Sequence, residues 1–293
     1  MDALQLVAAW PVGSAAVGVV GFDPPSAGSG RSGPEPAAVF GPDTRSFAWA
    51  SVTKLATALA VLVAAEEGTL ALDDPAGPAG ATVRHLLAHA SGLGPRPGPP
   101  LVPPAVSRIY SNAGYLVLGD LIAERSGMAF TDYLREGVLG PLGMTGTLLD
   151  PDAAEGAAAA GLAGPLVDLL SLGRELAIPT LIGGGTHRMA TSVQFPGLGG
   201  VLPGFRRFEP CDWGLGPEIR GAKQPHWTGT ENSPATFGHF GRSGSFLWVD
   251  PVAGVACAGL SDRSFGPWAA RSWPALADSV LEEAARRSGT GSE

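Results

Sequence analysis

Apolar and polar positions follow two kinds of pattern along the chain. Short apolar runs at residues 5–9, 15–22 and 47–50 have the length and the flanking turn residues that are typical of strands. Two further apolar runs between residues 244 and 260 are separated by a Pro/Gly-containing turn at 250–254, so they predict an antiparallel hairpin. Strands from both ends of the chain are therefore expected to meet in one antiparallel sheet.

The middle of the chain has a helical pattern. Residues 55–65 are almost wholly apolar and end before Gly68, a good stop signal, which predicts a buried helix that starts near residue 51. Helical patterns fill much of 51–180, and a last helix is expected from about residue 268 to 287, on one face of the sheet. The Gly/Ser/Pro-rich segment 24–36 is expected to be a loop.

These elements predict an α+β fold, in which an antiparallel sheet is flanked by helices and carries an inserted, mainly helical lobe. With 293 residues and 45% hydrophobic content, the chain can bury a sizeable core. We expect a single domain over residues 1–293, with a sheet lobe formed by residues 1–60 and 190–293 and a helical lobe formed by residues 61–189. A functional site would lie between the two lobes.

Lysine is rare in this chain, since 17 of its 19 cationic side chains are arginines, and Lys54 lies one helical turn after Ser51 at the start of the apolar helix. Residues three apart on a helix share a face, with Cβ atoms roughly 5–6 Å apart, so the Lys54 nitrogen can reach the Ser51 hydroxyl. Burial lowers the pKa of a lysine, and a helix N-terminus stabilises a developing alkoxide. The pair is typical of a nucleophile and its base, although an N-capping serine with an incidental lysine has the same sequence.

A second candidate is Tyr110-Ser111-Asn112, which follows a Pro/Gly-rich stretch and precedes an amphipathic helical segment that ends at Gly127. A tyrosinate next to a lysine can serve as a general base, and the Asn112 side chain offers a carbonyl for Lys54 and an amide for substrate. The alternative is structural, with Asn112 as a helix N-cap and Tyr110 as a half-buried packing residue.

A third candidate is the glycine-rich segment 238–244, which contains His239-Phe240-Gly241 and Arg242 and leads into the predicted hairpin. Glycines at the beginning of a strand let a substrate carbonyl approach its edge closely. A glycine-rich turn without chemistry is the alternative interpretation of this segment.

The three segments, in this order along the chain, resemble the motifs of the serine β-lactamase and penicillin-binding-protein superfamily. The resemblance is greatest to its class C β-lactamase branch, which includes carboxylesterases and D-amino-acid peptidases and has the motifs Ser-x-x-Lys, Tyr-x-Asn and Lys-Thr-Gly or His-x-Gly. It extends over about residues 15–265, including the segments 84–93 and 119–144. It implies the β-lactamase/transpeptidase-like form of the α+β fold.

The resemblance also implies a role for each motif residue. Ser51 would be acylated, Lys54 and Tyr110 would shuttle its proton, and Asn112 would position Lys54 and the acyl group. The oxyanion hole would consist of the backbone N–H groups of Ser51 and Arg242, donors that are typically worth about 2.7–4 kcal/mol each to the transition state. Hydrolysis would then proceed through a covalent acyl-enzyme.

The third motif departs from the β-lactamase pattern. His239 and Phe240 replace the lysine and threonine that β-lactamases use to hold the substrate carboxylate, whereas Gly241 is kept. Phe240 adds apolar surface at the mouth of the site, which suits an acyl or alkyl group better than an anion. The departure therefore favours ester hydrolysis over recognition of a penicillin.

The sequence thus predicts a serine hydrolase, specifically a carboxylesterase on small acyl esters, whose partner is a small-molecule ester or amide. One alternative is a D-amino-acid peptidase or a weak β-lactamase, because esters and amides are cleaved by the same mechanism. Another is a catalytically inactive, penicillin-binding-like sensor or binding domain. Trp213, His226 and Trp227, which precede the third motif, either line the acyl pocket or form a satellite core.

The sequence also indicates whether nucleic acid, membranes, metal ions or cofactors are expected as partners. The net charge of −8 argues against nucleic acid and anionic membranes as partners. His85 and His89 have the spacing of zinc ligands, but no glutamate lies between them and no third ligand is indicated, so a structural role and no metal are expected. No dinucleotide fingerprint occurs, so no cofactor is expected either, and the oligomeric state stays open.

Residues 3–22 carry no charge, but they lack a preceding basic region and are broken by Pro11 and Gly13. This favours a strand, a turn and a strand over a signal peptide or a membrane span, so a cytoplasmic location is expected. Cys211 and Cys257 are accordingly expected to be reduced thiols packed in the interior, although the sequence leaves open whether they approach each other.

Overall fold

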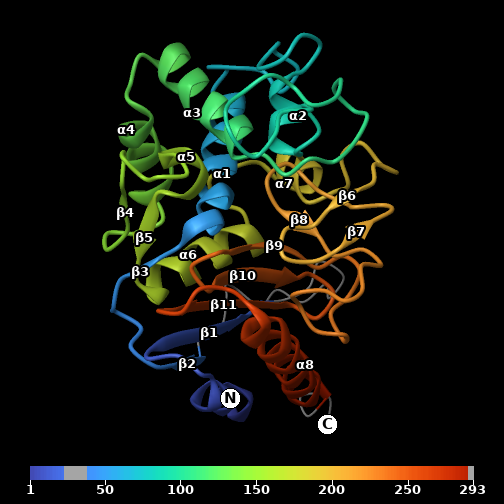
Figure 1. The fold of residues 1–293 in the computed structure, drawn as a ribbon. Helices are drawn as coiled ribbons and strands as arrows, with labels where there is room; N and C mark the ends of the chain where they lie inside the picture. Colours follow the sequence, from blue (N-terminus) through green and yellow to red (C-terminus); the bar gives the residue numbers. More distant parts are fainter. Residues whose placement is uncertain (23–37, 290–293) are drawn as a thin grey trace.

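The computed structural model describes residues 1–22 and 38–289. Its main feature is a six-stranded antiparallel sheet of order β2-β1-β11-β10-β9-β8 (Figure 1). β1 pairs along its whole length with β11, so that Ala15 lies opposite Ser261. The predicted strand at 15–22 and the predicted hairpin at 244–260 are therefore confirmed. The strands are β1 (Ala15–Gly21), β2 (Ala38–Phe40), β8 (Glu218–Ile219), β9 (Phe237–Gly241), β10 (Ser245–Asp250) and β11 (Val255–Ser261).

Helices cover both faces of this sheet (Figure 1). α6 (Leu166–Ala177) packs on one face, and α8 (Pro267–Gly289) lies on the other face. The residues of α6 fall in the range that was expected for the helical lobe, yet they contact the sheet. All residues of β10 are buried as a result, because Leu247 faces Gly173 of α6 and the ring of Phe246 lies 4.9 Å from that of Trp273 in α8. The α+β class and the C-terminal helix are confirmed.

The segment 5–9 differs from the prediction, because it belongs to the 3₁₀ helix η1 (Asp2–Ala9) and not to a strand. Its buried residues include Leu4 and Val7, whose separation of three positions is that of one face of a 3₁₀ helix. Trp10 follows, and its ring lies 5.5 Å from that of Trp268 in α8. The segment thus packs against the outer helix and does not extend the sheet.

The strand predicted at 47–50 also differs from the prediction, because β3 pairs with β5 in a small separate sheet and not with the hairpin. The indole N–H of Trp49 supports this pairing by donating to the carbonyl of Gly164 at 3.2 Å. A strand of two residues has too little alternation to indicate its partner. The strands of this sheet, in the order β3-β5-β4, are β3 (Phe47–Ala48), β5 (Leu162–Gly164) and β4 (Leu148–Leu149).

The helical lobe is built around α1 (Thr53–Glu66), which runs through the centre of the molecule (Figure 1). Every residue from Thr53 to Ala64 is buried, and Gly68, with a φ of 78°, confirms the predicted stop. The first turn of α1 lies where the helices meet the edge of the main sheet. The other elements are η2 (Ala50–Val52), α2 (Val83–Leu87), α3 (Asn112–Ser126), α4 (Phe130–Leu134), η3 (Arg135–Leu139), α5 (Ala157–Ala160), α7 (Gly184–Ala190), β6 (Gly200–Val201) and β7 (Arg207–Phe208).

Three further expectations concern membrane-spanning helices, the two cysteines and the loop at 24–36. Across the described ranges, no helix combines the length and the apolar character that crossing a membrane requires. Cys211 and Cys257 are both buried and unpaired, and burial raises the pKa of Cys211 to about 11. The loop expected at 24–36 lies outside the described residues.

Candidate active site

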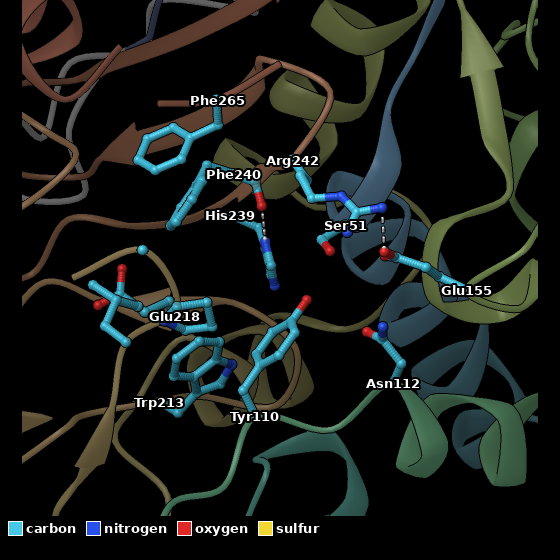
Figure 2. Close-up of a pocket in the computed structure, with 13 residues that line it drawn as sticks. Ser51, Tyr110, Asn112, Glu155, Trp213, Glu218, His239, Phe240, Arg242 and Phe265 are labelled. Carbon is cyan, nitrogen blue, oxygen red and sulfur yellow. Dashed lines mark hydrogen bonds and ion pairs between the residues drawn. The ribbon is translucent and has the colours of Figure 1, made fainter. Parts of the chain in front are cut away.

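Ser51 lies in η2, the short turn that precedes α1. The residue before it, Ala50, has a φ of 45°, a left-handed conformation that is strained for alanine and that turns the chain sharply before the helix begins. Ser51 lines a cavity of about 350 Å³ between the sheet edge and the helical lobe. The cavity is also lined by Tyr110, Asn112, Glu155, Leu202, Pro203, Gly204, Trp213, Glu218, His239, Phe240, Arg242 and Phe265 (Figure 2).

Lys54 follows Ser51 by one turn and is completely buried. Its Nζ donates to Oδ1 of Asn112 at 2.7 Å and to the carbonyl of Ala159 at 2.8 Å. Burial lowers the pKa of Lys54 to about 7, while the charge of Glu155 acts in the opposite direction. A neutral amine has two N–H groups and one lone pair. The two acceptors account for both N–H groups, so the lone pair is left to take a proton.

The Tyr110 ring lies against Lys54, whose Nζ is 4.9 Å from the ring centroid. The Tyr110 hydroxyl is buried and has no hydrogen-bond partner among the described residues. Burial raises the pKa of Tyr110 well above that of a free phenol, even though the nearby Ser51 hydroxyl lowers it. The side chain is therefore a neutral phenol near neutral pH, unlike the tyrosinate considered from the sequence.

Asn112 is the first residue of α3, but it does not cap this helix. Ser111 is the cap, because its Oγ accepts from the backbone N–H of Gly114 at 2.9 Å. The Asn112 side chain is thereby available to Lys54, and it borders the same cavity as Ser51. The structure thus brings together the four candidate residues of the first two motifs, Ser51, Lys54, Tyr110 and Asn112.

His239 and Phe240 lie on β9 and border the cavity. Nδ1 of His239 carries a proton, because it donates to the carbonyl of Phe240 at 2.7 Å. Burial and then the charge of Lys54 lower the pKa of His239 to about 3, so the ring is neutral. Its Nε2 is consequently an acceptor, and it has no partner in the described part of the chain. His239 thus contributes no positive charge to the lining of the cavity.

Gly241 is required by the close packing of β9 against the segment before Ser51. A Cβ atom on Gly241 would lie 2.4 Å from both the carbonyl oxygen of Trp49 and Oγ of Ser245. Ser245 Oγ itself donates to that carbonyl at 2.6 Å. The glycine therefore lets the end of β9, which is next to Arg242 in the sequence, approach η2, which contains Ser51.

The mouth of the cavity has an ion pair, because the mostly exposed Arg242 side chain lies 2.9 Å from the carboxylate of Glu155. Figure 2 shows this pair on the Ser51 side of the cavity. Sequence analysis missed Glu155, because it lies in the alanine-rich segment 153–164. A lone carboxylate in a segment of small residues is the signal that could have identified it.

A second missed carboxylate, Glu218 of β8, borders the other side of the cavity and is 2% exposed (Figure 2). It accepts from Lys223 Nζ at 2.8 Å, from His226 Nε2 at 2.9 Å and from Trp227 Nε1 at 2.8 Å. Burial by itself would raise the pKa of Glu218, but His226 and Lys223 bring it to about 2. Trp213 lines the cavity, as considered from the sequence, whereas His226 and Trp227 contact Glu218. The rarity of lysine, which singled out Lys54, could also have pointed to Lys223.

His85 and His89 make structural contacts. Nδ1 of His89 accepts from the backbone N–H of Ser111 at 3.1 Å, and the His89 ring lies 4.6 Å from that of Tyr110, so His89 supports the tyrosine loop. Nδ1 of His85 contacts Thr82 at the start of α2. Within residues 1–22 and 38–289, no group of three or more His, Cys, Asp or Glu side chains is arranged to hold a metal ion.

Comparisons with known proteins show which family and fold this chain resembles. A family model described as Beta-lactamase matches residues 27–282. The crystal structure of a beta-lactamase from Mycobacterium bovis is 48% identical, with a TM-score of 0.89 over 96% of this chain and 99% of its own. EstCE1, a hydrolase with promiscuous acyltransferase activity, shares the fold at 18% identity, with a TM-score of 0.72 over 95% of this chain and 96% of its own.

A curated relative adds a shorter match. Penicillin-binding protein 4* of Bacillus subtilis (strain 168) is 30% identical over an alignment of 134 residues that covers 34% of this chain, and the chain spans 30% of that relative's length. The expected resemblance to the serine β-lactamase and penicillin-binding-protein superfamily is thereby confirmed. Because the family model spans most of the chain, the chain belongs to the beta-lactamase family, whose fold serves serine hydrolases that include esterases and acyltransferases.

Proposed function

We propose that the chain is a carboxylesterase that hydrolyses small acyl esters through a covalent acyl-enzyme on Ser51. The observation that carries this proposal is the environment of Lys54, which is completely buried one turn from Ser51 and has a pKa lowered to about 7. Asn112 and Ala159 accept its two N–H groups, so its lone pair is available as a base. A buried amine costs stability, and a site without chemistry has no reason to keep one.

Acylation begins when Nζ of Lys54 takes the hydroxyl proton of Ser51 while Oγ attacks the ester carbonyl carbon. The developing oxyanion accepts hydrogen bonds from the backbone N–H groups of Ser51 and Arg242. When the tetrahedral intermediate collapses, the ester C–O bond breaks and the leaving alkoxide takes the Tyr110 proton, which protonated Lys54 replaces. This half-reaction yields the free alcohol and acyl-Ser51, with Lys54 neutral again.

Deacylation uses the same groups with water as the nucleophile. Tyr110 takes a proton from the attacking water and passes its own to Lys54, and the resulting tetrahedral intermediate is again held by the oxyanion donors. Its collapse expels the Ser51 alkoxide, which recovers a proton from Lys54. The acid product leaves, and the starting protonation states are restored.

The cavity lining supports an uncharged acyl group. Trp213, Phe240 and Phe265 supply an apolar wall, and His239 is neutral. Arg242, the cation at the mouth, is already paired with Glu155. None of these residues offers an unpaired cation to a carboxylate, which favours esters over penicillins. We place this activity in the cytoplasm, and cell fractionation tests that location.

A D-amino-acid peptidase or a weak β-lactamase is the second candidate. It is favoured by the 48% identity to the beta-lactamase from Mycobacterium bovis, and the same acylation chemistry serves amides. An inactive sensor or binding domain is the third candidate, which the lowered pKa of the buried Lys54 disfavours.

Intact-protein mass spectrometry tests these alternatives. Wild type, Ser51→Ala and the control Ser192→Ala, a change at an exposed serine, are each treated with a fluorophosphonate, a p-nitrophenyl acyl ester and a penicillin. The proposal expects phosphonylation and ester turnover in wild type and control, and neither in Ser51→Ala. A long-lived penicillin adduct without ester turnover would identify a penicillin-binding protein, and no adduct with any reagent would support the inactive domain.

A further inference from the structure

The ion pair of Glu155 and Arg242 lies between the cavity beside Ser51 and a second cleft of about 290 Å³. Both side chains line the cavity and the cleft, and Figure 2 shows their charged ends meeting next to Ser51. Among the described residues, the rest of the cleft is lined by five alanines and two serines. The cleft therefore offers neither member of the pair another charged partner.

The pair sets the charge that a substrate meets in the cavity. In the described part of the chain, Arg242 is the one permanent cation that lines it. His239 is neutral, because its pKa is lowered to about 3. The carboxylate of Glu218 is buried 2.8 Å from the Lys223 ammonium, so its charge is met within the protein. Whether the cavity attracts an anion consequently depends on whether Glu155 neutralises Arg242.

Glu155 acts on Arg242 through its charge and not by using up donors. A guanidinium has five N–H groups, and the Glu155 carboxylate lies 2.9 Å from one nitrogen. A substrate carboxylate on the remaining donors would lie close to Glu155, and two like charges at that distance repel each other. The charge of Glu155 is also felt further inside the site, because it raises the pKa of Lys54. Attraction by Arg242 and repulsion by Glu155 therefore offset each other.

Backbone contacts hold both residues in place independently of the ion pair. The carbonyl of Arg242 accepts from the backbone N–H of Phe265 at 2.9 Å. The turn that carries Glu155 is closed by the N–H of Gly156, which donates to the carbonyl of Ala153 at 2.7 Å. A change of either charged side chain should therefore alter the charge at the mouth and leave the backbone N–H of Arg242 in place.

We infer that Glu155 is the residue that determines the charge specificity of this site, and that without it the same cavity would accept substrates that carry a carboxylate. In this role, which rests on the proposed acyl-enzyme at Ser51, Glu155 contacts no reacting atom. A carboxylate that enters the aromatic cavity loses its hydration, and the neutralised Arg242 does not compensate for that loss. An uncharged acyl group has no such cost.

Matched p-nitrophenyl esters test this role. Their acyl chains end in a methyl, a carboxylate or a quaternary ammonium group, at a graded series of lengths. For each enzyme, kcat/KM of a charged ester is divided by that of the methyl-ended ester of the same length, at about pH 8.5, where Lys54 is mostly neutral. Each ratio compares two esters on one enzyme, so an altered base changes both values equally and cancels.

The two members of the pair should have opposite effects. Glu155→Gln is expected to raise the carboxylate ratio by about fivefold, the size typical of an ion pair between partly exposed groups. Arg242→Gln leaves the Glu155 carboxylate without its cation, so it should raise the quaternary ammonium ratio and lower the carboxylate ratio. The double variant Glu155→Gln, Arg242→Gln should show neither gain. High salt should reduce both gains, because it screens exposed charges.

Asp152→Asn is the matched control. It removes one negative charge three positions from Glu155, at an exposed residue outside the cavity and the cleft, and should keep both wild-type ratios. An equal gain in Asp152→Asn would assign the effect to net charge and overturn the role of Glu155. An unchanged carboxylate ratio in Glu155→Gln, folded by circular dichroism, would also overturn it. If that variant does not fold, an unchanged ammonium ratio in Arg242→Gln does so.

Binding separates this role from the proposed esterase. In Ser51→Ala, with and without Glu155→Gln, calorimetry compares the monomethyl and dimethyl esters of one dicarboxylic acid. If wild type turns over no ester, the esterase is refuted, but tighter relative binding of the monomethyl ester with Glu155→Gln still supports the role of Glu155. The same relative binding in both backgrounds overturns that role, even if wild type hydrolyses esters.

Discussion

Nζ of Lys54 lies 2.7 Å from Oδ1 of Asn112, although the two residues are 58 positions apart in the chain. The contact joins the first turn of α1 to the first turn of α3, so the proposed base depends on how these two helices pack. A carbonyl oxygen accepts from a lysine in either protonation state. Asn112 therefore orients the amine without requiring it to be charged.

Asn112→Asp is expected to raise the pKa of Lys54, because a carboxylate at this position would stabilise the ammonium. The rising limb of the pH profile of kcat/KM should then move to higher pH by about one unit or more. Asn112→Ala removes the orienting oxygen but adds no charge, so it should lower kcat without that shift. Profiles of both variants check the prediction, and an unmoved limb in Asn112→Asp would contradict it.

Lys54→Arg is expected to lower kcat/KM by about a hundredfold or more. Arginine keeps the positive charge and much of the bulk, but it does not give up its proton under protein conditions, so the base is lost. Thermal unfolding verifies that the variant folds, and Lys54→Met provides an uncharged variant of similar length. Near-normal turnover by either folded variant would refute the assigned role.

Activity of the wild type should rise as pH increases through about 7, since only neutral Lys54 takes the Ser51 proton. The charge of Glu155 raises the pKa of Lys54, so Glu155→Gln should move this limb to lower pH by a fraction of a unit. Arg242→Gln breaks the same ion pair but keeps the carboxylate, so it should not move the limb downward. If the rising limb moved to lower pH equally in both variants, the shift would come from the loss of the ion pair and not from the charge of Glu155.

Burial of Lys54 should also make stability depend on pH. Its pKa is about 7 in the folded chain against an ordinary value of 10.5, so the unfolded state binds more protons between these values. The Lys54 contribution to the free energy of unfolding therefore increases as pH rises above about 7. Denaturant titrations of wild type and Lys54→Met, from about pH 7 to about pH 9, should diverge with wild type gaining stability relative to the variant. Parallel curves would show that the folded pKa is not lowered.

Gly241→Ala should destabilise the chain by about 1–3 kcal/mol and reduce turnover. The added Cβ would lie 2.4 Å from the carbonyl oxygen of Trp49, so β9 and the backbone of Arg242 must move away from Ser51. Gly185→Ala in α7 is the matched control, because its Cβ meets nothing within 4 Å and alanine favours the helix. Chemical denaturation and kcat/KM are measured for both. If both variants showed the same small effect, β9 would not pack closely against the segment before Ser51.

Elements with strong local signals were predictable from the sequence. The apolar run that ends before Gly68 indicated α1, and apolar runs around a turn indicated β10 and β11. Weak local signals led to wrong predictions. Residues 5–9 form part of η1, and residues 47–48 pair with β5, because the partner of a short segment is set by contacts that are distant along the chain.

By itself, the sequence predicted a serine hydrolase from three motifs, and it placed Ser51 within reach of Lys54, because residues three apart share one turn of a helix. Only the tertiary structure decided the protonation state and the shape of the site. The pKa of Lys54 reflects its burial against Asn112 and against a carbonyl 105 positions away. The cavity carboxylates Glu155 and Glu218 likewise come from distant segments. Desolvation and charge depend on distance in space, so no pattern along the chain specifies them.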